Sequence, residues 1–242
     1  MQRQVLSLVD GRSKRVIKKT NRLIEECDIV HYAFSCAEQV ENIHEPSTYT
    51  EAVVSGDREK WIAAMQEEMR SLDKNGTWDV VSLPKHKKTV RCKWIFKRKE
   101  GLDPSEPARF KARLVAKGFS QIPGIDYNDV FSPVVKHSSI RAFFGIVAMH
   151  DLELEQLDVK TAFLHGELDK EIYMDQPEGF IVPGKEKFVC KLKRSLYGLK
   201  QSPRQWYKRF DSFMIAHGFK RSAYDSCVYI KFVDGSPIYL LF

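Results

Sequence analysis

Two stretches decide the fold, TVRCKWIFKRK at 89–99 and ARFKARLVAKG at 108–118, because apolar and basic side chains alternate in both. In the first stretch Trp94 and Phe96 fall on one face, and the basic residues lie mainly on the other. A period of two predicts two half-buried strands. The turn-forming residues between them, Gly101–Pro107, predict that the strands join as a hairpin.

Together the two predicted strands carry nine Lys and Arg residues and no Asp or Glu. A solvated sheet face normally mixes both signs, so we expect an unneutralised basic face, which favours phosphate binding. The nine residues are Arg91, Lys93, Lys97, Arg98, Lys99, Arg109, Lys111, Arg113 and Lys117. The whole chain has a net charge of +7, which is typical of proteins with a polyanionic partner such as nucleic acid or an anionic membrane surface.

The composition is that of a globular protein. Of 242 residues, 43% are hydrophobic and 29% are charged, which excludes a collagen, a coiled-coil rod and a wholly disordered chain. No segment approaches the roughly 20 apolar residues of a membrane helix, so no membrane partner is expected. The five cysteines are widely spaced and follow no apolar leader, which indicates reduced thiols in an intracellular compartment.

Residues 1–45 differ in character from residues 46–242. The run Arg12–Arg22 is basic without a single acid, and apolar periodicity is weak, so we expect a solvated, weakly ordered tail. A nucleic-acid contact or a nuclear import signal is the alternative for this run. Four Cys and His residues have a spacing that matches no structural zinc site, namely Cys27, His31, Cys36 and His44.

Outward from the hairpin, the pattern predicts both helices and strands. Capping boxes at Thr48 and Ser202 predict two helix starts, and Asp57 predicts the start of a third helix that ends at Asn75. The other predicted elements are a helix at 138–149 and strands at 78–81, 154–159, 172–174, 188–192, 227–233 and 238–242. This order indicates an α+β fold with a largely antiparallel sheet. The sequence stops within the last strand, so we expect an incomplete molecule with an apolar, aggregation-prone edge.

Six segments follow one another in a characteristic order. They read KWIFKR (93–98), FKARLVAKG (110–118), DYNDVFSPV (126–134), QLDVKTAFLHG (156–166), EIYMDQPEG (171–179) and SLYGLKQSPRQW (195–206). Over about residues 57–242 the chain closely resembles the reverse transcriptase domain of copia-type retrotransposon Pol polyproteins. The resemblance implies a right-hand polymerase, with residues 46–242 forming the fingers and the N-terminal part of the palm. Residues 1–45 would be the linker that follows an integrase.

The resemblance also implies the chemistry, which is template-directed dNTP addition by two Mg²⁺ ions, with Mn²⁺ as a substitute. It makes Asp158 a catalytic metal ligand, with the main-chain carbonyl of Val159 as its companion. An acid at the end of an apolar strand would be poorly solvated unless a cation met it. From the pattern alone, an Asp that caps the following turn is the more common alternative.

The resemblance assigns further residues to the nucleotide. Phe163 matches the residue that packs under the dNTP sugar and excludes a 2′-hydroxyl, although a core aromatic is the alternative. Lys111 and Arg113, with Lys97 across the hairpin, are candidates for the triphosphate, because Arg grips phosphate in a fork and Lys acts as a point charge. A template contact or simple solvation stays open for these three cations.

The loop and helix start at 195–206 resemble the lining of the nucleotide and template pocket. The complete predicted nucleotide-binding set is Lys97, Lys111, Arg113, Phe163, Tyr197, Gly198 and Gln201. The predicted nucleic-acid-binding set is Arg91, Lys93, Arg109, Lys117 and Lys200. The expected partners are an RNA template, a DNA primer, dNTPs and the remainder of the Pol polyprotein, with its integrase and ribonuclease H.

One departure from the family matters most. The family's second catalytic motif, Tyr-x-Asp-Asp, occurs nowhere in these 242 residues. With a single carboxylate, two Mg²⁺ ions would lack ligands, so we expect this polypeptide alone to be inactive. The alternative function is a non-catalytic nucleic-acid-binding remnant. Family activity would place the protein in a cytoplasmic particle with later nuclear entry.

Overall fold

The computed structural model describes residues 45–101 and 106–242. The basic run Arg12–Arg22 and the four Cys and His residues between 27 and 44 lie outside the described residues, as does nearly all of the predicted tail. Within the described part of the chain, no helix combines the length and the apolar character needed to cross a membrane.

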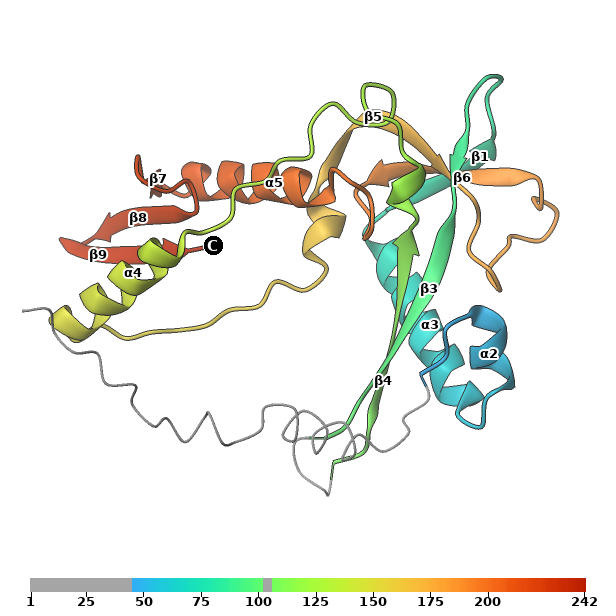
Figure 1. Cartoon of the computed structure of the whole chain (residues 1–242), viewed down its shortest axis with the longest axis horizontal. Coiled ribbons are helices and arrows are strands. Elements are labelled where there is room, and N and C mark those ends of the chain that lie inside the picture. The colour runs from blue at the N-terminus through green and yellow to red at the C-terminus, as the bar shows by residue number, and fades with distance from the viewer. Residues whose placement is uncertain (1–44, 102–105) are drawn as a thin grey trace, which may run out of the picture. The chain divides into compact units, whose positions relative to one another are not determined.

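The hairpin forms as the alternation predicts (Figure 1). Strand β3 (Cys92–Lys99) pairs antiparallel with β4 (Arg109–Ala116) in a two-stranded sheet. Trp94 lies opposite Leu114, and both side chains are buried. Period-two alternation therefore puts one face of the hairpin into the hydrophobic core and leaves the basic residues outside.

Two helices pack in succession on the buried face of the hairpin. They are α2 (Tyr49–Val54) and α3 (Arg58–Lys74), and α3 packs against β4 of the hairpin while α2 packs against α3. The predicted cap of α2 is confirmed, because the Thr48 hydroxyl accepts the Glu51 N–H at 3.2 Å. In α3, Trp61 meets the rings of Phe96 and Phe110 edge-on, at centroid distances of 5.3 and 4.6 Å. These aromatic contacts fix the helix to the hairpin.

A second sheet has the strand order β1-β6-β5-β2. Its strands are β1 (Trp78–Ser82), β6 (Phe188–Arg194), β5 (Glu167–Met174) and β2 (Thr89–Val90), and only the β2–β5 pair is parallel. The predicted strand 89–99 is thus two strands, separated at Arg91. The carbonyl of Val90 accepts the Asp175 N–H at 3.1 Å, whereas that of Arg91 accepts the Lys117 N–H at 2.7 Å. The chain passes from one sheet to the other at Arg91.

The third sheet has the order β7-β8-β9 and lies beside helix α5 (Ser202–Ala216). Its strands are β7 (Lys220–Arg221), β8 (Val228–Val233) and β9 (Ser236–Leu241). The predicted turn between β8 and β9 is confirmed, with positive φ at Asp234 and Gly235. The segment 238–242 pairs with β8 as the edge strand of this sheet, and Phe242 stacks on Phe210 of α5 at 4.2 Å.

The predicted cap of α5 is wrong by one residue. The N-cap is Gln201, and the Ser202 hydroxyl instead donates to the carbonyl of Leu196 at 2.6 Å. Gln205 closes no capping box, because its side-chain amide donates to Asp169 at 2.7 Å. Both side chains found tertiary partners, and local sequence rules do not include such partners.

Helix α4 (His137–His150) also takes its cap from elsewhere in the chain. The Asp225 carboxylate accepts the Lys136 N–H at 3.0 Å and the Ser139 hydroxyl at 2.6 Å. No residue of α4 is buried, and Phe144 and Met149 are exposed. The predicted helix forms, but its apolar residues find no cover within the described part of the chain.

The predicted strand at 154–159 is wrong, since these residues form no regular structure. Leu157 is 82% exposed and Val159 is 46% exposed. A strand requires a neighbour that bonds its N–H and C=O groups, and among the described residues none pairs with this segment. Asp158 is therefore exposed to solvent and is not buried at a strand end.

Two glycines hold β4 against the loop at 195–201. Gly198 has φ +86°, and a Cβ there would lie 2.2 Å from the carbonyl oxygen of Ala116. A Cβ on Gly118, which opens the 3₁₀ helix η1 (Gly118–Ser120), would lie 2.1 Å from the carbonyl oxygen of Gly198. The Ala116 N–H donates to the carbonyl of Tyr197 at 2.8 Å. Only glycine allows this approach of two backbones.

We expect Gly198→Ala to destabilise the protein by about 2–5 kcal/mol, because it combines left-handed backbone strain with steric overlap. Gly124→Ala is the matched control, since Gly124 has φ +79° and a Cβ there would meet no atom within 4 Å. Strain alone should cost this control about 1–2 kcal/mol. Urea unfolding followed by circular dichroism measures both variants, and equal losses would contradict the close-packing argument.

Candidate nucleic-acid interface

The register of the hairpin places like charges directly opposite each other. Lys97 pairs with Lys111, and two positions along the same face Lys99 pairs with Arg109. Like charges at directly opposed positions destabilise an antiparallel pair. Arg113 continues the same face of β4, opposite Ile95. A hairpin that keeps two repulsive pairs in succession is therefore suited to an anionic ligand that relieves the repulsion.

Carboxylates partly neutralise this face, so the prediction of an unneutralised face is wrong. Lys97 pairs with Glu45 at 2.9 Å. Toward the tip of the hairpin, Arg109 of the same face pairs with Glu106 at 3.2 Å, and Arg98, on the opposite face, pairs with Glu100 at 2.9 Å. All three acids lie outside the two strands, so the period-two pattern of the strands could not predict these ion pairs.

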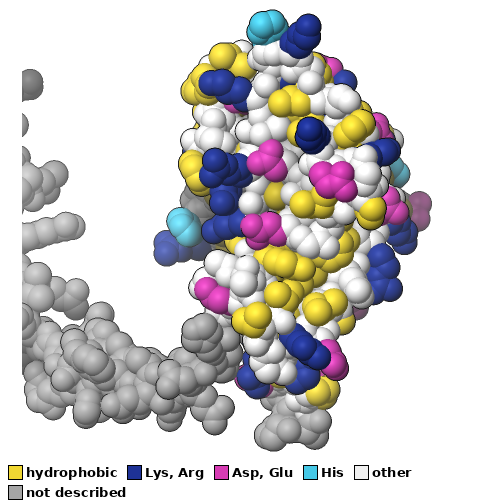
Figure 2. Space-filling view, turned by 90° about the vertical axis from the view of Figure 1, so that its right-hand side faces the viewer, with side chains coloured by type: hydrophobic (Ala, Val, Ile, Leu, Met, Phe, Trp, Pro, Cys, Tyr) yellow, Lys and Arg dark blue, Asp and Glu magenta, His cyan; other side chains and the backbone are white. Residues whose placement is uncertain are grey.

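The part of the hairpin nearer the core keeps its positive charge. No ion pair joins Lys93, Lys111 or Arg113 to a carboxylate of the residues that the structure describes. By contrast, the face of the molecule seen in Figure 2 mixes basic and acidic side chains. On the neighbouring four-stranded sheet, for example, Lys191 pairs with Glu171 at 2.6 Å.

Three of the predicted nucleotide-binding residues meet beside β4. The guanidinium of Arg113 lies 5.7 Å from the centre of the Tyr197 ring, which is within cation–π range. On its other side Tyr197 meets Phe163 edge-on at 5.4 Å. Phe163 belongs to the 3₁₀ helix η2 (Ala162–His165). Strand β4, the loop at 195–201 and η2 thus each contribute one side chain to a partly open cluster.

Two carboxylates, those of Glu68 and Asp158, affect the pKa of the Tyr197 hydroxyl. Burial raises the pKa of Tyr197, the positive charge of Arg113 opposes the rise, and the negative charges of Glu68 and Asp158 add to it. Tyr197 therefore stays protonated at neutral pH and can donate a hydrogen bond. The effect of Asp158 also shows that this carboxylate lies within electrostatic reach of the cluster.

Glu68 of α3 is a residue of this region that the sequence analysis did not assign. Its Oε1 accepts the Leu114 N–H of β4 at 3.3 Å. Burial raises its pKa, while the hydrogen bond from Leu114 and the charge of Arg113 lower it, and the net pKa lies above the ordinary value. The sequence held a signal, because Glu68 falls in the apolar stripe of α3 between Met65 and Leu72.

The other predicted pocket residues are divided between surface and interior. Gln201 is 3% exposed, accepts the side-chain N–H of Gln121 at 3.1 Å and donates to the carbonyl of Asp126 at 3.2 Å. Gly198 packs on Ala116, as described above. Gln201 thus binds other segments of the chain through its side chain, whereas Lys200 is exposed.

The remaining predicted nucleic-acid contacts follow the hairpin. Arg91 and Lys117 lie at its base, where their backbones are hydrogen-bonded at 2.7 Å. Lys93 lies opposite Val115 on the outer face, and Arg109 lies at the start of β4. The four residues are therefore distributed along the length of the hairpin.

The residues that surround Asp158 do not by themselves fit a two-metal site. Among the described residues, no group of three His, Cys, Asp or Glu side chains could hold a metal ion. Asp158 and the Val159 carbonyl supply two oxygen donors on a segment without a strand partner. Mg²⁺ requires near-octahedral oxygen coordination, which these two donors cannot complete.

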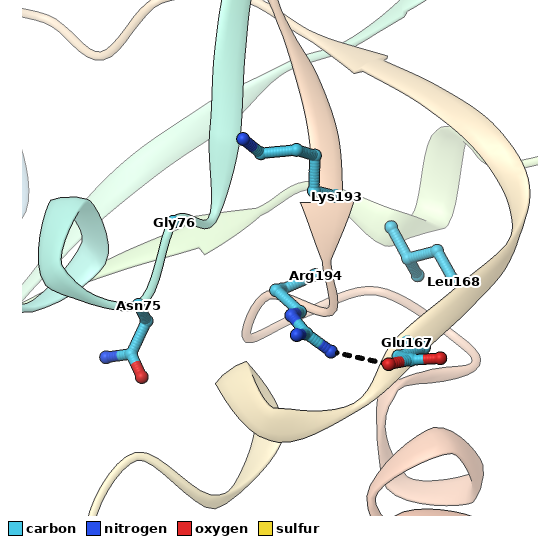
Figure 3. A pocket seen from close by; sticks show the side chains of 6 residues that line it. All are labelled: Asn75, Gly76, Glu167, Leu168, Lys193 and Arg194. Atoms are coloured by element: carbon cyan, nitrogen blue, oxygen red, sulfur yellow. Dashed lines mark hydrogen bonds and ion pairs between the residues drawn. The ribbon is translucent and has the colours of Figure 1, made fainter.

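A cavity of about 490 Å³ lies beside β5 and β6 (Figure 3). Its lining residues are Asn75, Gly76, Glu167, Leu168, Lys193 and Arg194. Arg194 and Glu167 form an ion pair across it at 2.9 Å, drawn as a dashed line in Figure 3. None of the predicted site residues lines this cavity.

The hairpin carries a basic outer face beside an aromatic cluster, and comparison with known proteins identifies the class of the protein. A family model described as reverse transcriptase (RNA-dependent DNA polymerase) matches residues 75–241. The chain therefore belongs to the reverse transcriptase family. This result confirms the family predicted from the six segments.

Its relatives are Pol polyproteins of copia-type retrotransposons. The chain is 54% identical over 198 residues to the retrovirus-related Pol polyprotein from transposon TNT 1-94 of Nicotiana tabacum. It is 42% identical over 198 residues to that from transposon RE1 of Arabidopsis thaliana, and 28% identical over 207 residues to the transposon Ty1-DR5 Gag-Pol polyprotein of Saccharomyces cerevisiae.

Each of these alignments covers 81% of this chain but only 15%, 13% and 11% of the three relatives. The chain thus spans a small part of the length of the polyproteins that it matches. No solved structure matches the chain.

We expect the Glu68→Gln variant to become more stable relative to the unchanged protein as pH rises. A raised pKa means that the folded state binds the proton more tightly, so folding favours protonated Glu68 and loses this contribution as pH rises through its folded pKa. Glutamine keeps an acceptor for the Leu114 N–H. Thermal unfolding between acidic and neutral pH measures the difference in stability, with Glu59→Gln of the same helix as the exposed control, and a constant difference would contradict the argument.

Proposed function

We propose that the chain supplies the template- and nucleotide-binding part of an RNA-directed DNA polymerase. The observation that carries the proposal is the two pairs of opposed like charges on the outer face of the hairpin, next to the cluster of Arg113, Tyr197 and Phe163. In a right-hand polymerase the hairpin would belong to the fingers. The ligands would be an RNA template, a DNA primer and dNTPs.

The charges divide naturally between two kinds of phosphate. Arg113 and Lys111 lie two residues apart on one face of β4, so both can reach one triphosphate. Arg91, Lys93, Arg109 and Lys117 extend along the element and suit the phosphates of a strand. Phe163, half-buried against Tyr197, would lie under the sugar of the dNTP.

Asp158 would contribute one carboxylate to the Mg²⁺ ions of the intact enzyme, with the Val159 carbonyl beside it. Bound metal ions would stabilise the attacking and leaving oxygens of phosphoryl transfer. Other parts of a Pol polyprotein, which also contains integrase and ribonuclease H, would have to supply the remaining ligands. This chain's own residues bind and orient the nucleotide and the template.

A non-catalytic nucleic-acid-binding remnant is the second candidate function. One observation favours it: Asp158 is exposed on an irregular segment. Such a protein would bind nucleic acid in a salt-sensitive manner without turnover.

Replacing Lys93, Lys111 and Arg113 together by Gln should weaken binding of a short single-stranded RNA by about tenfold or more at low salt. The slope of log affinity against log salt should become shallower by up to about 2, at roughly 0.7 for each lost phosphate contact. Fluorescence anisotropy across a salt series measures both quantities.

The matched control replaces three exposed lysines away from the hairpin, namely Lys85, Lys88 and Lys187, by Gln. Both triple variants remove the same charge, so the control isolates position from net charge. Equal losses of affinity in the two variants would show that the hairpin face is no specific site.

The purified 242-residue chain should show no Mg²⁺-dependent primer extension on an RNA template, because one carboxylate leaves the metal ions without sufficient ligands. The measurement is extension of a labelled DNA primer, with an intact reverse transcriptase as positive control. Extension that Asp158→Asn abolishes would refute the prediction and establish a catalytic chain.

A further inference from the structure

Glu45 holds an unusual position on the basic hairpin. One carboxylate oxygen, Oε1, lies 2.9 Å from the ammonium of Lys97 and accepts the Arg98 backbone N–H at 3.0 Å. The other oxygen, Oε2, accepts from the same ammonium at 3.1 Å. Both oxygens of one carboxylate are thus bound by an ammonium and a strand N–H.

This donor set is the one that proteins use for phosphate oxygens. Charge-assisted bonds from a lysine and a backbone N–H are typical of anion sites. Lys111 stands directly opposite Lys97 in the register and adds a second positive charge. A carboxylate here relieves the repulsion between the two lysines, as a phosphate would.

Glu45 is charged in this position. Its burial would raise its pKa, but the hydrogen bonds from Lys97 and Arg98 and the charge of Lys97 outweigh it, so the pKa is lowered. The side chain of Lys97 is still 62% exposed. Exposed ion pairs contribute little to folding stability, so another anion can take the place of the carboxylate without unfolding the hairpin.

We propose that the Lys97 ammonium and the Arg98 N–H form an anion site, which the Glu45 carboxylate occupies before the ligand binds. A phosphate group of the ligand then displaces the carboxylate from this site. Glu45 therefore competes with the ligand and weakens its apparent affinity. The proposal rests on the proposed function of the hairpin and adds to it a residue that regulates access. The phosphate can come from a free triphosphate or from a phosphodiester strand.

The test compares Glu45→Gln with Glu106→Gln in the 242-residue chain. Both variants remove one negative charge from an ion pair on the same hairpin, since Glu106 pairs with Arg109 at 3.2 Å. Glutamine at 45 keeps an acceptor for the Arg98 N–H, which preserves the fold. Thermal unfolding of both variants verifies this point, and the probes are dATP and a short oligo(dT).

We expect Glu45→Gln to tighten binding by about 5–10-fold at low salt. This factor corresponds to a carboxylate that fills the site about 80–90% of the time, since the ligand can bind only to the remaining fraction. The Glu106→Gln control should change affinity by less than about twofold, because an exposed pair of this kind is weak. Added salt should shrink the advantage of Glu45→Gln. In a Lys97→Gln background the same change should have no effect, because the site has lost its ammonium.

The two probes identify the source of the phosphate. Tighter binding of dATP alone assigns the site to a triphosphate, and tighter binding of oligo(dT) alone assigns it to a strand. Equal effects of Glu45→Gln and Glu106→Gln would overturn the proposal while leaving the hairpin a binding site. Failure of every variant to bind either probe would overturn the proposed function as well.

Discussion

The close contact between the end of β4 and the loop at 195–201 is the constraint on which the site depends. The Ala116 N–H bonds to the Tyr197 carbonyl, and Gly118 and Gly198 let the two backbones approach. This contact sets the Tyr197 ring beside Arg113. Any side chain at Gly198 would push the loop away, and the cluster of three side chains would separate.

The hairpin next to this contact balances stability against binding. Two successive like-charge pairs weaken it, and the aromatic packing of Trp61 on its inner face offsets the loss. Carboxylates from other segments then cover part of the positive charge. The most specific of these is Glu45, which binds Lys97 through both oxygens. The basic side chains of the hairpin thus weaken the fold by repelling one another and favour the binding of an anionic ligand.

Local patterns predicted most elements of the fold because their causes are local. Alternation in 89–99 and 108–118 reflects a solvent boundary that runs along the hairpin, and Asp234-Gly235 has a single good turn conformation. The failures share one cause, which is a tertiary partner. The Ser202 hydroxyl donates to the Leu196 carbonyl, the Gln205 amide donates to Asp169, and the segment 154–159 has no neighbouring strand among the described residues.

The candidate site divides along the same line. The sequence by itself determined the family, the basic hairpin and the residue types of the nucleotide cluster, since these lie in contiguous motifs. Only the tertiary structure decided that Lys97 faces Lys111, that Gln201 is buried, and that Glu45 and Glu68 bind the hairpin. Strand register and the partners of distant carboxylates depend on contacts between segments far apart in the chain, which no local periodicity encodes.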